Sequence, residues 1–72
     1  PSGAKAITKS DTDTFDKPVA LYVGVTGNVV VTPANGGSDV TFAGVPAGAM
    51  LPCMVTAVKS TNTTASSMVA IY

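Results

Sequence analysis

The chain has 72 residues, equal numbers of acidic and basic side chains, one cysteine and no histidine. This length allows a single domain. The composition excludes an internal disulfide, a zinc site of Cys and His ligands, and the commonest general base of enzymes. Chains of this size usually need a disulfide, a metal or partner subunits for stability. With the first two excluded, oligomerisation is favoured, and a weakly stable monomer is the alternative.

Charge is distributed unevenly along the sequence. Six of the eight charged side chains lie in the first 17 residues, and only Asp39 and Lys59 follow. Monomer surfaces usually carry about a quarter charged residues, whereas interface cores are depleted of charge. We therefore expect an N-terminal arm, residues 1–17, and a β domain, residues 18–72, whose surface is largely covered by neighbours. The alternative is that Thr, Ser and Asn side chains keep a monomer in solution.

The sequence also argues against two classes of partner. Zero net charge and the lack of a Lys/Arg cluster disfavour nucleic acid, because phosphate binding needs concentrated positive charge. No segment is expected to cross a membrane, and the N-terminus has no signal-peptide core. A first residue of Pro is typical of initiator-methionine removal, and a lone cysteine suits a reducing compartment. We therefore expect synthesis in the cytoplasm.

The arm contains two patterns that resemble local motifs without completing them. Ser10 followed by Asp13 resembles a helix-capping pair, but no apolar periodicity follows, so at most one short helical turn is expected. Asp11, Asp13 and Asp16 begin like a calcium loop that lacks its glycine and distal glutamate. A solvated or locally hydrogen-bonded arm is therefore predicted. Phe15 is expected to anchor it by packing on the domain or on a neighbour.

Five segments of the β domain have the composition of strands, being rich in β-branched and aromatic residues between Gly, Pro, Asn and Ser. These expected strands run over residues 19–25, 28–32, 40–43, 50–58 and 68–72. Pro52 cannot donate to a ladder, so it marks an edge, a bulge or the first turn of its strand. The pattern predicts an all-β fold, a small five-stranded antiparallel barrel or sandwich with an irregular N-terminal arm.

Alternation along the first expected strand separates its two faces. The face expected to point inward carries Val19, Leu21, Val23 and Val25. Tyr22 lies on the opposite face, where it is expected to be exposed on a free protomer and buried against a partner, as aromatic anchors often are. The predicted interface residues, drawn from the arm and the domain, are Phe15, Tyr22, Thr63 and Tyr72.

The sequence contains no catalytic motif that we recognise. A nucleophile elbow, a phosphate-binding glycine loop and a dinucleotide fingerprint are all missing. Cys53 has no His to activate it and lies in an apolar segment, so it is expected to be a small buried hydrophobe. We therefore predict a protein that is not an enzyme and that has no cofactor and no metal site.

Several short segments follow one another in an order that is known from one family. They are Ala20-Leu21-Tyr22-Val23-Gly24, Gly27-Asn28-Val29, Val40 to Gly48, Leu51-Pro52, Thr61 to Ala65 and Val69 to Tyr72. In their order and spacing, from about Ile7 to the end, the sequence resembles the small spike-base and head-decoration proteins of tailed bacteriophages and gene transfer agents. The arginines that this family often carries in its lead-in and fourth strand are absent here.

The resemblance implies a virion structural protein on the surface of the head. Its implied partners are the major capsid protein, copies of itself in a trimer or pentamer, and in addition a fibre or spike protein. It would act either as a capsid decoration or cement protein or as a vertex spike base. The alternative is a carbohydrate- or receptor-binding module of a head fibre. The polar loop over residues 59–67 offers hydrogen bonds to sugar hydroxyls, but it has no aromatic side chain.

Overall fold

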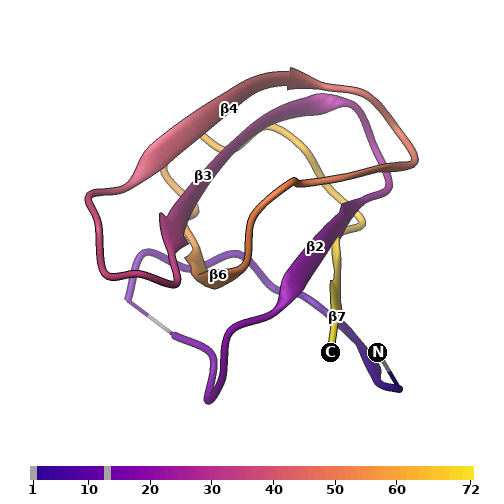
Figure 1. The fold of residues 1–72 in the computed structure, drawn as a ribbon. Helices are drawn as coiled ribbons and strands as arrows, with labels where there is room; N and C mark the ends of the chain where they lie inside the picture. The colour runs from indigo at the N-terminus through magenta and orange to yellow at the C-terminus, as the bar shows by residue number, and fades with distance from the viewer. Residues whose placement is uncertain (1, 13) are drawn as a thin grey trace.

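The computed structural model describes residues 2–12 and 14–72, which form strands and loops arranged in two antiparallel sheets (Figure 1). The first sheet has the strand order β1-β7-β2-β5, and the second has the order β4-β3-β6. The strands are β1 (Ala4–Ala6), β2 (Ala20–Val23), β3 (Gly27–Pro33), β4 (Val40–Val45), β5 (Ala49–Met50), β6 (Val55–Val58) and β7 (Val69–Ile71). The predicted all-β class is confirmed. Within these residues no helix has the length and apolarity needed to cross a membrane.

The core lies between the two sheets and is built from aliphatic side chains. Its largest fully buried members, on β2, β3 and β6, are Leu21, Val23, Val29, Val31 and Val55. Successive strand residues point to opposite faces, so every second position of β2 and β3 enters the core. Val19 and Val55 exchange two backbone hydrogen bonds of 2.9 Å, which join the first sheet to the second. Burial of each such side chain stabilises the fold by about 1.5–3 kcal/mol.

The first predicted strand is shorter than expected, and one of its inward positions was wrong. Val25 is 47% exposed, whereas Val19, Leu21 and Val23 are buried as predicted. The ladder of β2 ends at Val23. At Gly24 the backbone passes so close to the Ser67 carbonyl that a Cβ atom would collide with it. The chain turns there towards β3, and Val25 keeps only a single bridge to the 66–67 segment.

The predicted strand over residues 50–58 is in fact two strands that belong to different sheets. β5 pairs with β2 in the first sheet, and β6 pairs with β3 in the second. Leu51 still donates to the Leu21 carbonyl at 3.0 Å, but Pro52 has no N–H with which to continue the ladder. The chain changes sheets at this point. Cys53 lies in the connection, partly buried and packed against the core.

The arm was predicted to be irregular, and this was wrong for its first residues, because β1 pairs with β7 at the edge of the first sheet. Beyond β1, backbone hydrogen bonds hold the arm to the domain, from Ile7 to Met68 (3.0 Å), Ser10 to Val58 (3.0 Å) and Phe15 to Thr56 (2.7 Å). The described arm residues contain no helical turn, and Asp13 of the expected capping pair lies outside the described residues. The arm therefore lies on its own protomer. Its first limb, residues 4–7, runs beside β7, and its second limb, residues 10–15, runs beside β6.

Candidate functional site

The outer face of the first sheet is uncharged and almost wholly aliphatic. Residues opposite one another in an antiparallel pair share a face. Strand register therefore sets two rows of side chains beside each other, Ala4, Ile71 and Ala20 in one, and Ala6, Val69, Tyr22 and Met50 in the other. We call these seven residues the apolar face. The intervening residues Leu21 and Ala70 are buried in the core, which fixes the apolar face as the outward one.

Two large side chains of the apolar face are exposed. Tyr22 is 36% exposed and Met50 is 52% exposed, and they lie directly opposite each other on β2 and β5. An antiparallel sheet with one face on a core normally has polar side chains on the other. A contiguous apolar patch on a small protein marks a contact surface. The predicted exposure of Tyr22 on the protomer is confirmed, while its burial against a partner stays a prediction.

The second sheet has an outer face of a different character. Because Val29 and Val31 are buried, the alternate positions of β3 and their neighbours on β4 point outward. Among them, the hydroxyl of Thr32 donates to a carboxylate oxygen of Asp39 at 2.6 Å, and Thr41 is exposed. Val30, opposite Thr41, is half-buried on the same face, so the outer face of the second sheet is more polar than the apolar face but not free of apolar side chains.

Thr63, a predicted interface residue, has its side chain inside the protomer. It is 6% exposed, and its hydroxyl accepts a hydrogen bond of 3.0 Å from the backbone N–H of Val30. The hydroxyl of the next residue, Thr64, accepts a bond of 2.8 Å from the backbone N–H of Asn28. Side chains of this loop thereby accept hydrogen bonds from backbone N–H groups of β3, at the place where a further strand would otherwise pair. A contact between Thr63 and a partner stays a prediction.

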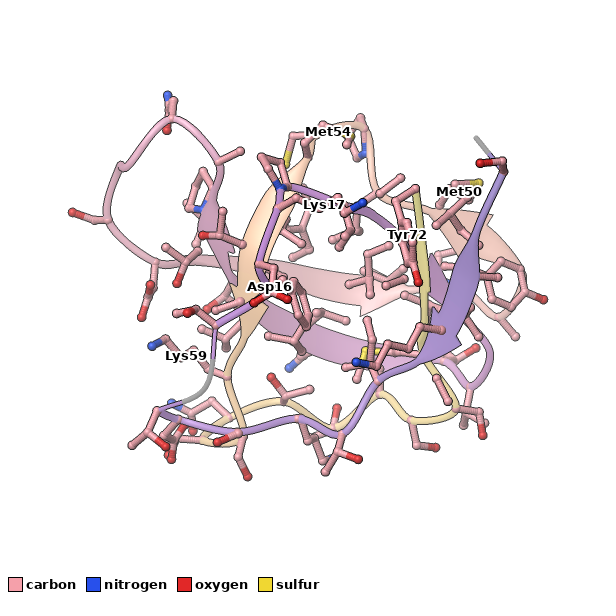
Figure 2. The ribbon with its side chains drawn as sticks, turned by 90° about the horizontal axis from the view of Figure 1, so that it is seen from below. Asp16, Lys17, Met50, Met54, Lys59 and Tyr72 are labelled. Carbon is pink, nitrogen blue, oxygen red and sulfur yellow. The ribbon has the colours of Figure 1, made fainter. Side chains whose placement is uncertain are left out.

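Phe15 and Tyr72 lie on the opposite side of the first sheet from the apolar face. Both line a cleft of about 790 Å³ between the two limbs of the arm. The ring of Phe15 packs against the core, as expected for an anchor. Tyr72 exchanges two backbone hydrogen bonds with Gly3, and the ammonium group of Lys17 lies 4.8 Å from the centre of its ring (Figure 2). The four predicted interface residues therefore do not gather at one place.

Asp11 fastens the turn of the arm to the loop after β6. Its carboxylate accepts hydrogen bonds from the backbone N–H groups of Ser60 and Thr61, both at 2.9 Å, and from the Thr61 hydroxyl at 2.7 Å. The pKa of Asp11 is lowered below its ordinary value, first by the Thr61 hydroxyl, then by the Thr61 backbone, and less by Ser60 and Lys59, while partial desolvation opposes them. These bonds favour the charged form. Asp11 thus acts as a local acceptor for the protein's own backbone.

The acidic residues of the arm do not form a metal site in the described part of the chain. Within residues 2–12 and 14–72, no three Cys, Asp or Glu side chains lie close enough together to hold a metal ion. Asp13 of the predicted acidic cluster is not among these residues. The surfaces that remain as candidates are the apolar face and the cleft.

Comparison with known proteins relates the chain to a solved capsid structure. No protein-family model matches the sequence, and no curated protein matches it. Among solved structures, the chain is similar to a chain in the "Capsid of native GTA particle computed with C5 symmetry", where GTA denotes a gene transfer agent. The two chains superpose with a TM-score of 0.81 and are 33% identical, over 96% of this chain and 80% of that chain. The similarity extends over nearly all of the sequence.

Proposed function

The chain belongs to the family of this gene transfer agent capsid component, and on that premise we propose that it is a structural protein of a phage-like capsid surface. It binds the capsid shell and copies of itself, as a decoration protein or as the base of a vertex spike. Its work is contact between chains rather than chemistry. The observation that carries this proposal is the apolar face on a protomer that has so little charge beyond its arm.

The size of the two exposed side chains supports a contact of useful strength. An aromatic side chain presents roughly 200 Å² to burial. The exposed 36% of Tyr22 therefore corresponds to about 70 Å² and, at about 25 cal/mol per Å², to about 2 kcal/mol on binding. Met50, which is 52% exposed, adds on the order of 1 kcal/mol. A few side chains of this kind usually supply most of the free energy of an interface.

The rigidity of the protomer also supports the proposal. The apolar face is built from four hydrogen-bonded strands, and its central strands lie on the buried core. A preformed surface loses little conformational freedom on binding, so more of the contact energy appears as affinity. The polar outer face of the second sheet suits the side that stays in water.

The test is the binding of purified protein to capsid shells that were assembled without it, measured by co-sedimentation. We expect the unmodified protein to saturate the shells. The variant Tyr22→Lys is expected to bind about a hundredfold more weakly or worse, because a buried unpaired charge costs several kcal/mol. The matched control Thr41→Lys places the same charge on the exposed outer face of the second sheet and is expected to bind normally.

Two results would reject the proposal. One is that the unmodified protein fails to bind the shells at any concentration. The other is that Tyr22→Lys and Thr41→Lys bind equally well while both remain folded by circular dichroism.

A further inference from the structure

The cleft between the limbs of the arm has an apolar floor and lies behind the first sheet. The floor consists of buried or half-buried side chains, namely Ile7, Phe15, Val19 and Ala70. Its volume of about 790 Å³ falls within the range of about 300–1,000 Å³ that is usual for ligand sites. Such sites combine an apolar lining with a few placed polar groups. The rim of this cleft has such polar groups.

The rim carries two ammonium groups that make no ion pair with the described residues. Lys5 and Lys17 both line the cleft. In the described part of the chain, neither donates a hydrogen bond to a protein oxygen, whereas Lys9 and Lys59 both donate to backbone carbonyls. Lys17 instead contacts the ring of Tyr72. A cation in this position keeps most of its capacity to bind a carboxylate.

Among the described residues, one acidic side chain, that of Asp16, also lines the cleft. Figure 2 shows Asp16 pointing away from Lys17 and Tyr72, which lie side by side. Hydroxyl groups of Thr8, Thr12 and Thr14 line the same space and can bond to the backbone of a bound chain. The rim therefore offers cationic groups and neutral hydrogen-bonding groups above an apolar floor.

We propose that this cleft binds an extended acidic segment of a partner chain. Apolar side chains of the segment lie on Phe15 and Val19, and its carboxylates bind Lys5 and Lys17. The cleft lies mainly on the other side of the first sheet from the apolar face, since Lys5 and Ala70 alternate with Ala4, Val69 and Ile71, and only Ala6 of the edge strand borders both surfaces. Apart from Ala6, the two sets of residues do not overlap, so this inference does not depend on the proposed docking of the apolar face.

The test is an NMR titration of the ¹⁵N-labelled full chain with a short capped peptide of alternating Asp and Val residues. Matched peptides carry Asn or Lys in place of Asp. We expect the Asp peptide to shift amide signals of the cleft, including those of Phe15, Val19 and Ala70. The Asn peptide is expected to bind about fivefold more weakly, since exposed charge pairs contribute up to about 1 kcal/mol. The Lys peptide is expected not to bind.

Variants then identify the cationic groups. Lys17→Gln is expected to lower the affinity for the Asp peptide about two- to fivefold. The double variant that also carries Lys5→Gln is expected to bind the Asp and Asn peptides with equal affinity. Lys59→Gln removes the same charge outside the cleft and keeps a hydrogen-bond donor for Asp11, so it is expected to bind as the unmodified protein does.

Three results would overturn the inference. They are the absence of shifts at the cleft, equal affinity for the Asp and Asn peptides, and equal weakening by Lys59→Gln and Lys17→Gln. Thermal unfolding of each variant separates a loss of binding from a loss of fold.

Discussion

Two neighbouring threonines make the same hydrogen bond in different surroundings, and their replacement by valine gives a sharp test of the fold. Thr63 accepts from the Val30 N–H in a buried position, and Thr64 accepts from the Asn28 N–H at the surface. The exchange of Thr for Val keeps the shape of the side chain and removes the acceptor in both cases. We expect Thr63→Val to destabilise the protein and Thr64→Val to have little effect.

The expected magnitude follows from burial. In Thr63→Val the N–H of Val30 is left without an acceptor, which costs about 1–3 kcal/mol. The added buried methyl group offsets up to about 0.8 kcal/mol of this. The net loss of about 1–2 kcal/mol lowers Tm by about 5–15 °C for a domain of this size. In Thr64→Val water takes the place of the hydroxyl, so the change stays within about 0.5 kcal/mol.

Urea unfolding followed by circular dichroism gives both free energies, and amide exchange of Val30 reports the lost bond directly. Equal stability of the two variants would contradict the assignment of Thr63 as a buried partner of β3. Its placement inside the protomer would then have to be given up in favour of an exposed, partner-binding position.

Two further predictions concern the arm and a close backbone contact. Asp11→Asn is expected to be less stable than the unmodified protein at neutral pH, because hydrogen bonds to the carboxylate lower its pKa in the folded state. A lowered pKa stabilises the fold above the unfolded value, near 3.8, so urea unfolding should show the difference shrinking as pH falls below it. A difference that does not change with pH would argue against this bond. Gly27→Ala would place a Cβ atom 2.5 Å from the backbone nitrogen of Ala65, and overpacking there is expected to cost about 1–3 kcal/mol. Gly37→Ala, which meets only the flexible Asn35 side chain at 3.3 Å, is the control, and equal Tm values would contradict the prediction.

The parts of the fold that depend on local sequence were predictable. The runs of β-branched residues and the Gly, Pro and Asn turns between them place β2, β3, β4 and β7 close to their observed positions. β1 was missed because Ala-Lys-Ala has no strong strand preference, and only its pairing with β7 makes it a strand. Pro52 gave a visible signal of interruption, but the move from one sheet to the other depends on distant partners.

The candidate surface was predictable only in its centre. Alternation alone placed Tyr22 outward. The other members of the apolar face come from three further strands, and their gathering depends on a register that no local pattern specifies. One signal was present: the last strand is apolar at every position, Val69-Ala70-Ile71, as in strands that are covered on both faces. The burial of Thr63 could not be predicted, because nothing in the neighbouring sequence shows that its hydroxyl bonds to β3.

The pairing of Tyr72 with Gly3 has a practical consequence for any engineered form of this protein. Both ends of the described chain emerge together at the rim of the first sheet (Figure 1). A purification tag or displayed cargo joined to either end would therefore hang beside the cleft that Tyr72 lines and would obstruct it. The exposed 34–39 hairpin loop, at the far edge of the second sheet, is the better attachment point. In a circularly permuted chain, a short linker would join the present ends and new ends would be opened in that hairpin. Cargo attached there would lie beside the solvent-facing side of the second sheet.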